Sequence, residues 1–312
     1  MKRITIPNVK LPVTGLIMGS DYFTPKRIEE VCDILDAYVE IGGNTIDTAF
    51  IYMEGESERA IGMWVQRRGN RDRINLWTKG AHPDENGSRV KPEIIREELL
   101  ISLERLQTDY VDLYALHRDD PEVPVGVILE ALNEQVEAGR IRAFGVSNWT
   151  HERIQEANDY AAQHGLVGIS FNSPNLSLAK AKEPYWPGCV SADDATIEWH
   201  TRTGMPLFSW SSQARGFFSG RFSPEKPDHP DLVRVFYSDD NWERYRRAER
   251  LGRELGVPTI QVALAYVLNQ PFPTAAIIGP QNRDEMLSCA AGANIRLTPE
   301  QLAWLDLKRE EL

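Results

Sequence analysis

The sequence lacks several features that would assign it to a specialised class of protein. It has three cysteines in 312 residues, and Cys32, Cys189 and Cys289 lie far apart without the spacing of a metal site. No run of eighteen apolar residues is present, and Pro7 and Asn8 interrupt any apolar stretch behind the N-terminus. We therefore expect reduced thiols, a cytoplasmic location and no bound metal.

Basic charge is also in short supply. The 35 Lys and Arg residues are outnumbered by 46 Asp and Glu, which gives a formal net charge of −11, and the two signs are interspersed along the chain. A nucleic-acid surface needs a basic patch, and the sequence shows none. Hydrophobic residues at 42% and charged residues at 26% are typical of a globular chain. We therefore expect neither a nucleic-acid nor a membrane partner.

Short apolar runs alternate with longer stretches of helical spacing, and the cycle repeats about eight times. The expected strands are 16–20, 45–49, 74–78, 111–117, 141–147, 168–172, 206–210 and 275–279. The expected helices are 25–41, 56–68, 92–106, 125–138, 151–164, 193–203, 239–256 and 283–291. Two further helices are expected at 258–269 and from residue 299, where Thr298, Pro299 and Gln301 form the pattern of a capping box.

The connection pattern favours a closed parallel barrel. No G-x-G-x-x-G motif follows a strand, so a Rossmann site has no support. Eight βα units without a long Pro/Gly/Ser linker favour a (β/α)8 TIM barrel, with one domain over residues 1–312. We expect residues 3–11 to form a hairpin that closes the barrel bottom. Function in this fold is expected in the loops at the carboxyl ends of the strands.

Four polar side chains follow three successive expected strands. Asp47 and Tyr52 follow the second strand, Lys79 the third and His117 the fourth. Any one of them alone is equally well explained as a solvated loop residue. Together they can converge at one rim of the barrel, and convergence is what a proton-transfer site requires.

Several motifs resemble those of the aldo-keto reductase superfamily. They are residues 43–49 (GNTIDTA) with Tyr52, residues 78–80 (TKG), residues 102–106 (SLERL), residues 108–117 (TDYVDLYALH) and residues 145–148 (GVSN). The resemblance covers nearly the whole chain in order. It implies an NAD(P)H-dependent oxidoreductase that reduces an aldehyde or ketone to an alcohol, or catalyses the reverse.

The resemblance implies that Asp47, Tyr52, Lys79 and His117 form a catalytic tetrad. A tyrosine hydroxyl, with an ordinary pKa near 10, is a poor acid at neutral pH unless a cation stabilises the phenolate. Lys79 would supply this cation, and Asp47 would fix Lys79 in place. His117 would donate a hydrogen bond to the substrate carbonyl while Tyr52 protonates its oxygen.

A nicotinamide cofactor is implied by the same resemblance, with NADP(H) as the default and NAD(H) as the alternative. Ser147 and Asn148 would bind the nicotinamide carboxamide, and Trp210 would stack on the ring. The other residues expected along the cofactor are Gly19, Ser20, Asp21, Asp47, Asn172, Ser173, Ser211, Ser212, Gln213, Arg215, Gly216, Arg221, Gly279, Gln281, Arg283 and Glu285.

Some of these positions depart from the common family pattern. Glu285 and Cys289 stand where many members have Arg or Gln and Asn, and Ser173 stands where Gln is common. A carboxylate would repel a 2′-phosphate, whereas Gln281 and Arg283 could hold it. The preference between NADP(H) and NAD(H) is therefore open at this point.

The substrate is the least predictable feature, because the substrate loops vary while the barrel stays the same. The residues expected to face it are Tyr22, Phe23, Tyr52, His82, His117, Arg118 and Trp186. Their aromatic content favours a partly apolar pocket, and His82 and Arg118 could contact a polar or anionic group.

Two other functions are compatible with parts of this pattern. The barrel could be a cofactor-holding regulatory subunit that resembles potassium-channel β subunits, in which catalysis is secondary. It could also be a barrel isomerase or hydrolase, with Asp47 and His117 as acid and base. The second alternative leaves Trp210 and the segment 211–221 without a role. The sequence does not determine the oligomeric state.

Overall fold

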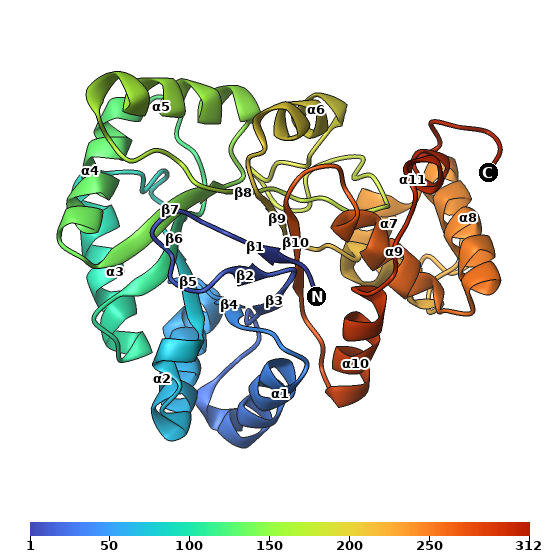
Figure 1. Cartoon of the computed structure of the whole chain (residues 1–312), viewed down its shortest axis with the longest axis horizontal. Helices are drawn as coiled ribbons and strands as arrows, with labels where there is room; N and C mark the ends of the chain where they lie inside the picture. The colour runs from blue at the N-terminus through green and yellow to red at the C-terminus, as the bar shows by residue number, and fades with distance from the viewer.

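The computed structural model describes all residues 1–312 and contains a closed barrel of eight parallel strands surrounded by helices (Figure 1). The barrel strands are β3 (Leu16–Gly19), β4 (Thr45–Asp47), β5 (Asn75–Gly80), β6 (Val111–Leu116), β7 (Ile141–Ser147), β8 (Asn172–Ser173), β9 (Leu207–Ser209) and β10 (Thr274–Ile278). Each strand pairs with the next one in the chain, and β10 closes the barrel against β3. The predicted (β/α)8 barrel is therefore confirmed.

Helices cover the outside of the barrel and agree closely with the sequence pattern. They are α1 (Ile28–Glu40), α2 (Glu56–Arg68), α3 (Pro92–Leu106), α4 (Val125–Glu137), α5 (His151–His164), α6 (Asp194–Thr203), α7 (Pro230–Phe236), α8 (Asp239–Leu255), α9 (Thr259–Leu268), α10 (Arg283–Gly292) and α11 (Pro299–Leu305). Short 3-10 turns are η1 (Pro25–Arg27), η2 (Tyr52–Gly55), η3 (Arg71–Arg73) and η4 (Ala214–Ser219). The predicted capping box of α11 is confirmed, since Thr298 and Gln301 exchange side-chain and backbone hydrogen bonds.

Helix α7 and the sixth barrel strand differ from the expectation. Helix α7 was not predicted, because it is only seven residues long and Pro224, Pro227 and Pro230 precede or open it. The sixth barrel strand was expected over 168–172, but only Asn172–Ser173 form it. The Asn158 side chain bonds both the N–H and the C=O of Ile169, at 2.7 and 3.3 Å, and so satisfies backbone groups that a strand ladder would otherwise pair.

An N-terminal hairpin closes one end of the barrel. It consists of β1 (Arg3–Ile4) and β2 (Val13–Thr14), which pair antiparallel. The hairpin expected over 3–11 is therefore wrong in its second strand. Pro12 carries no N–H for a ladder, and Val9 N–H bonds Ile6 O in a turn, so pairing starts only at Val13.

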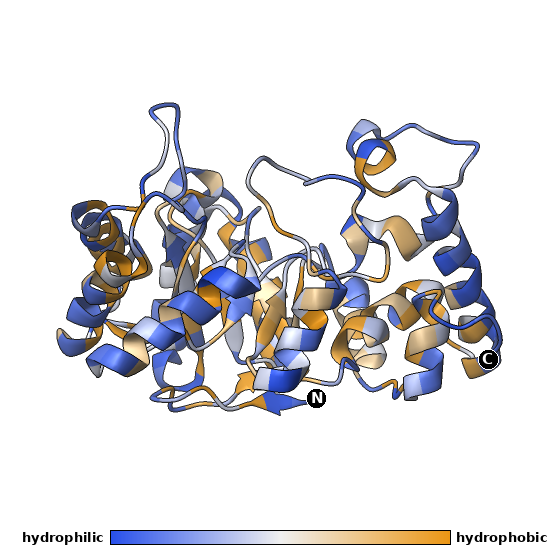
Figure 2. Ribbon diagram, turned by 90° about the horizontal axis from the view of Figure 1, so that it is seen from above, coloured by the Kyte–Doolittle hydropathy of each residue, from blue (hydrophilic) through white to orange (hydrophobic).

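The hairpin acts as a plug. Its buried residues pack against large side chains inside the barrel in one hydrophobic cluster, which contains Ile4, Ile6, Val9, Val13, Trp77, Phe171 and Phe208. The expectation that the hairpin plugs the barrel bottom is confirmed. The longer loops project from the opposite end of the barrel, away from the N-terminus (Figure 2).

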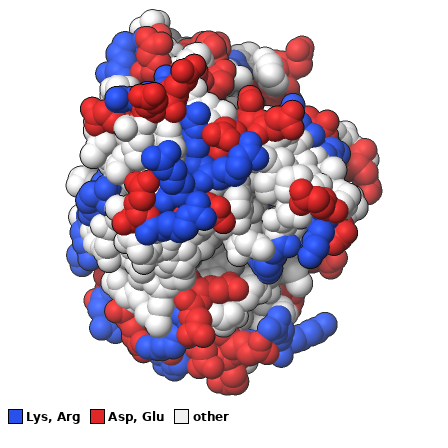
Figure 3. All heavy atoms as spheres, turned by 90° about the vertical axis from the view of Figure 1, so that its right-hand side faces the viewer, with Lys and Arg blue, Asp and Glu red and all other residues white.

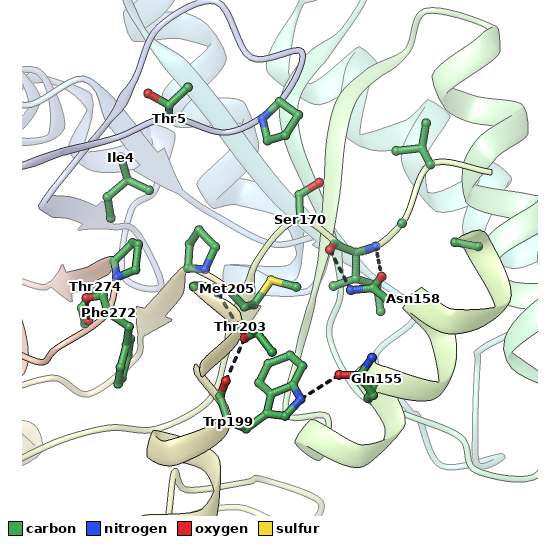
Figure 4. Close-up of a pocket in the computed structure, with 18 of the residues that line it drawn as sticks. Ile4, Thr5, Gln155, Asn158, Ser170, Trp199, Thr203, Met205, Phe272 and Thr274 are labelled. Carbon is green, nitrogen blue, oxygen red and sulfur yellow. Dashed lines mark hydrogen bonds between the residues drawn. The ribbon is translucent and has the colours of Figure 1, made fainter. Parts of the chain in front are cut away.

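A groove of about 990 Å³ lies at the plugged end (Figure 4). The hairpin, α5, α6 and the amino ends of β8, β9 and β10 line it. Some of its polar side chains bond one another, since Trp199 Nε1 donates to Gln155 Oε1 at 3.0 Å. The ionisable residues expected at the strand ends are not among those that line this groove.

The face of the molecule that carries α8 mixes basic and acidic side chains (Figure 3). Within α8, Arg246 pairs with Glu243 at 2.8 Å and Arg250 with Glu254 at 3.1 Å. None of the helices combines the length and the apolar character that crossing a membrane requires.

Candidate active site

Asp47, Tyr52, Lys79 and His117 come together at the carboxyl ends of β4, β5 and β6. Asp47 is the last residue of β4, and Lys79 is the last but one of β5. His117 directly follows β6, where its N–H bonds Gly80 O at 2.8 Å. Because parallel strands end at the same rim, the β-sheet register alone brings these residues close together.

Lys79 is the centre of this group. Its Nζ forms an ion pair with Asp47 and donates to the Thr48 carbonyl at 2.9 Å and to Tyr52 Oη at 3.2 Å. The side chains of Lys79 and Asp47 are only 3% and 4% exposed. The ammonium therefore connects a buried carboxylate to the phenol.

Burial works against both charges of this pair. It raises the pKa of Asp47 to about 6, although Lys79 opposes the shift. It also lowers the pKa of Lys79, which Asp47 opposes. Each charge persists in this poorly solvated place largely because the other is beside it.

Tyr52 opens η2 after β4 and is partly buried. Burial raises its pKa well above the ordinary value, and the Asp47 carboxylate raises it further. The charge of Lys79 does not bring this pKa below the ordinary value in this structure. The reason is that Asp47 offsets the charge of Lys79 while burial disfavours the phenolate. Tyr52 is therefore a protonated donor at neutral pH.

The chain turns sharply behind Tyr52. Met53, Glu54 and Gly55 have φ values of 50°, 57° and 86°, so three successive residues are left-handed. Arg105 of α3 supports this turn, because it donates to Phe50 O at 2.9 Å and packs where a Cβ on Gly55 would lie. The strained turn is thus held in place by the arginine of the SLERL segment.

His117 faces Tyr52, with ring centroids 5.7 Å apart, and lies 4.8 Å from the ring of His82. Burial lowers the pKa of His117 well below its ordinary value, and the charge of Lys79 adds to the shift. Its Nδ1 is buried without a hydrogen-bond partner. The ring is therefore neutral at pH 7 and carries one N–H, which can donate a hydrogen bond to a carbonyl oxygen.

Asn148 connects three parts of the rim. It lies directly after β7 with a left-handed φ of 61°. Its Nδ2 donates to His117 O at 3.3 Å, while its Oδ1 accepts from Trp210 Nε1 at 3.2 Å and from Val190 N at 3.1 Å. Ser147 beside it donates to Ser173 O at 2.9 Å. Asn148 thus orients the partly exposed indole of Trp210.

The segment 211–221 after β9 contains two guanidinium groups without an ion pair. Arg215 stacks over Tyr185 and Trp186, at 4.9 and 5.3 Å from the ring centroids. Arg221 donates from Nε to Ser219 Oγ at 3.1 Å. Left-handed φ values occur at Ser211, Ala214, Arg215, Gly216 and Gly220. Of the other residues expected here, Ser212 donates to Ile277 O and Gln213 to Ile260 O.

The segment after β10 differs from what the sequence suggested for a phosphate site. Arg283 forms an exposed ion pair with Glu40 of α1. The Glu285 carboxylate accepts the backbone N–H of Gln281 at 2.9 Å, and Gln281 Nε2 donates to Gly279 O at 3.3 Å. The backbone N–H of Gln281, just before α10, is therefore already hydrogen-bonded to a carboxylate.

Several residues expected along the cofactor have partners inside the protein. Ser20 Oγ donates to Asp47 O at 2.7 Å and is fully buried. Asn172 Nδ2 lies 3.3 Å from His200 Nε2 on α6, and Ser173 Oγ donates to Phe208 O at 2.7 Å. Gly19 lies in the β3 ladder opposite Asp47, and Asp21 is exposed at the rim.

Of the residues expected to face the substrate, one lies in the core and the others lie at the rim. Phe23 is 1% exposed and packs in the core, so its expected contact with substrate is wrong. Tyr22 donates to Pro280 O at 2.5 Å and so lies against the segment after β10. His82 and Arg118 lie beside His117, whereas Trp186 lies 5.9 Å from the ring of Trp210.

One contact in this region could not be predicted from the sequence. Arg118 Nη2 donates to Cys189 Sγ at 3.3 Å, although the two residues are 71 positions apart. Cys189 drew attention only as one of three scattered cysteines. No local pattern could have revealed this contact, because only the folded loop between β8 and α6 creates it.

Comparison with known proteins agrees with this geometry. The profile of the Aldo/keto reductase family matches residues 15–310. The chain belongs to this family. An aldo-keto reductase, str7, from Strobilurus tenacellus is 28% identical over 91% of the chain and 82% of its own length. The aryl-alcohol dehydrogenase [NADP(+)] of Phanerodontia chrysosporium is 26% identical over 88% of the chain and 74% of its own length.

Solved structures of the family share the fold. An aldo-keto reductase from Klebsiella pneumoniae in complex with NADPH superposes with a TM-score of 0.73 and 25% identity, over 99% of this chain and 95% of that one. A second structure from the same organism has a TM-score of 0.74 at 24% identity, over 98% and 95% of the two chains.

Proposed function

We propose that this protein is an NADPH-dependent reductase of aldehydes or ketones, in which Tyr52 is the proton donor. The observation that carries the proposal is the position of Lys79 Nζ, paired with Asp47 and 3.2 Å from Tyr52 Oη, beside a neutral His117. Membership in the Aldo/keto reductase family supports the reaction class. An aryl-alcohol dehydrogenase that uses NADP(+) and a structure that contains NADPH support the choice of cofactor.

The residues at the rim fit a nicotinamide dinucleotide. Trp210 offers a partly exposed aromatic face whose orientation Asn148 fixes. Arg215 and Arg221 are cations without carboxylate partners, as a pyrophosphate site requires. We expect these four residues to hold the cofactor, with Ser147 beside the nicotinamide. When bound, NADPH supplies the hydride to the carbonyl carbon.

The tetrad supplies the proton that the carbonyl oxygen takes up during reduction. A carbonyl oxygen between Tyr52 and His117 accepts hydrogen bonds from the phenol and from the imidazole N–H, which polarise the C=O bond. Negative charge then develops on that oxygen, and Tyr52 donates its proton to it. The resulting phenolate lies 3.2 Å from Lys79 Nζ, so the ammonium stabilises it when it forms. In the oxidation direction the same groups act in reverse.

The test combines binding with turnover. We would follow the quenching of tryptophan fluorescence during titration with NADPH and with NADH, and then add 4-nitrobenzaldehyde and follow cofactor absorbance. We expect Tyr52→Phe to bind NADPH normally and to lose about 10²–10⁴-fold in turnover, because the proton donor is missing. The matched control is Tyr160→Phe, whose hydroxyl contacts Glu130 on the barrel surface.

Three results would contradict the proposal. Full turnover by Tyr52→Phe would remove Tyr52 from the mechanism. A wild-type protein that binds neither cofactor would favour the isomerase or hydrolase alternative, whereas binding without turnover of any carbonyl would favour a regulatory barrel.

A single domain over 1–312 and a cytoplasmic location stay predictions.

A further inference from the structure

Arg118 is a buried cation at the rim of the site without a counter-charge. The residue is 8% exposed and forms no ion pair. Its Nη1 donates to the His117 carbonyl at 2.8 Å and its Nη2 to Cys189 Sγ at 3.3 Å. Its Nε is buried without a partner. Of the five N–H donors of a guanidinium, only two are engaged, and one of these meets a weak sulfur acceptor.

This situation is unusual within the chain. Arg244, the one other arginine that is buried, faces Asp306 at 3.8 Å. The partly buried Arg71, Arg105 and Arg153 also face carboxylates, those of Asp112, Glu58 and Asp119, at 2.8, 3.2 and 3.4 Å. Burial of a single charge without a partner costs several kcal/mol of folding free energy. Arg244 is compensated within the protein and Arg118 is not, so the free donors of Arg118 are available to an anion.

The surroundings place Arg118 beside the reacting groups. It directly follows His117, and the loop of Gly188 and Cys189 covers its stem. Burial lowers the pKa of His117 and of His82, and the positive charge of Arg118 adds to both shifts, so Arg118 lies near both rings. Trp186, from the covering loop, is 43% exposed and lies 5.9 Å from the ring of Trp210.

We infer that Arg118 binds a carboxylate carried by the carbonyl substrate, so that the preferred substrates are aldehyde acids or oxo acids. This inference rests on the proposed reductase function. A carboxylate matches the planar fork of a guanidinium and can accept two parallel hydrogen bonds from it. A single monoanion also fits the charge count, because the neighbouring cation, Lys79, is already paired with Asp47.

The experiment compares an acid with its neutral ester. We would measure kcat and KM with NADPH for 4-carboxybenzaldehyde and for methyl 4-formylbenzoate. We expect the wild type to favour the acid, mainly through a lower KM. We expect Arg118→Met to reduce the acid-to-ester ratio of kcat/KM by about 10–100-fold, the loss of one or two hydrogen bonds to a charged group. Arg118→Lys retains the charge without the fork and should restore part of the ratio.

A second variant separates binding from a purely structural role. If Arg118 served only to hold the loop through Cys189, then Cys189→Ala would change the ratio as much as Arg118→Met. We expect Cys189→Ala to keep the wild-type ratio, because it removes only the sulfur acceptor. Binding of benzoate, measured by calorimetry on the wild type and on Arg118→Met, provides a readout that does not depend on turnover, and we expect it to be lost in the variant.

The outcomes distinguish this inference from the reductase proposal. Turnover of the ester with no preference for the acid, or equal losses for both substrates in Arg118→Met, would overturn the carboxylate site and leave the reductase intact. A preference for 4-formylphenyl phosphate over the carboxylate would overturn it in favour of a phosphate. If no carbonyl is reduced, the reductase proposal fails, while benzoate binding that depends on Arg118 would still support the anion site.

Discussion

Burial dominates the ionisable side chains of the tetrad. It opposes the charged forms of Asp47, Lys79, Tyr52 and His117 alike, and only the pairing of Asp47 with Lys79 offsets it. The result at neutral pH is a protonated phenol, a neutral imidazole and one ion pair. This is the set of protonation states from which a carbonyl can accept a proton and a hydrogen bond.

The pH dependence of reduction should reflect Asp47. Its pKa of about 6 means that the carboxylate loses its charge as the pH falls through 6, so that Lys79 loses its partner. We expect kcat/KM to fall on the acid side with a midpoint near 6, and we expect Asp47→Asn to have a lower rate without this limb. His117 does not titrate in this range, since its pKa is lowered well below 6.5. A rate that stays constant down to pH 5 would contradict this assignment.

The contribution of Asp47 to the free energy of unfolding depends on pH in the opposite direction from its effect on kcat/KM. The pKa of Asp47 is raised from 3.8 in the unfolded chain to about 6 in the folded protein, so the folded state binds more protons between these values. Its contribution to the free energy of unfolding is therefore fully present below about pH 4 and is lost as the pH rises through 6.

Glu285 should weaken the preference for NADPH. Its carboxylate bonds the Gln281 N–H at the start of α10, where a 2′-phosphate would meet its charge. We expect Glu285→Gln to raise the ratio of NADPH to NADH affinity by about tenfold, which corresponds to about 1.4 kcal/mol. The matched control is Asp284→Asn, which removes the same charge one residue away. A ratio that does not change, or that changes equally in both variants, would exclude a local role for Glu285.

Among the elements, α2 and α3 pack with unusually close backbones. A Cβ at Gly62 in the middle of α2 would lie 2.6 Å from Arg105 O and 2.8 Å from Leu106 C. This approach matters to the site, because α3 carries Arg105, which supports the turn after Tyr52.

Substitution of Gly62 tests this packing. Gly62→Ala gains up to about 1 kcal/mol of helix propensity but overpacks a rigid backbone contact, which costs about 1–3 kcal/mol. We expect a lower free energy of unfolding in urea. Gly126→Ala in α4 is the comparison, because its Cβ would meet only the movable end of the Tyr160 ring. Equal effects of the two substitutions would show that the backbone contact is not limiting.

Most elements of this fold could be predicted from the sequence, and the failures have local causes. The bounds of α2, α3, α5 and β7 agree with their predicted ranges. The start of the sixth strand was wrong because a side chain from α5, Asn158, replaces its backbone partners. The second strand of the hairpin was wrong because alternation of apolar residues does not reveal where a turn ends.

At the scale of the whole molecule, the hydrophobic plug and the proposed catalytic residues lie at opposite ends of the barrel. The hairpin and its hydrophobic cluster close the amino end of the strands, whereas the tetrad lies at the carboxyl end. Loops at the second end can therefore vary without loss of the core.

Cofactor binding should stabilise the whole fold. A ligand that binds only the folded state at 100 times its Kd adds about 2.7 kcal/mol. For a chain of this size we expect NADPH to raise Tm by roughly 5 °C, at about 2 °C per kcal/mol. Calorimetry with NADPH checks this, with free adenine as the control. An unchanged Tm at saturating NADPH would contradict the proposed cofactor site.

The sequence by itself determined the barrel, the family resemblance and the choice of the four residues proposed as the tetrad, because each of these depends on periodicity or on motifs that are local in the chain. Only the tertiary structure decided the protonation states, the partners of Arg118 and Arg283 and the burial of Phe23. Burial and charge neighbours set those properties, and they come from segments far apart in sequence: Arg118 meets Cys189 across 71 positions, and Arg283 meets Glu40 across 243.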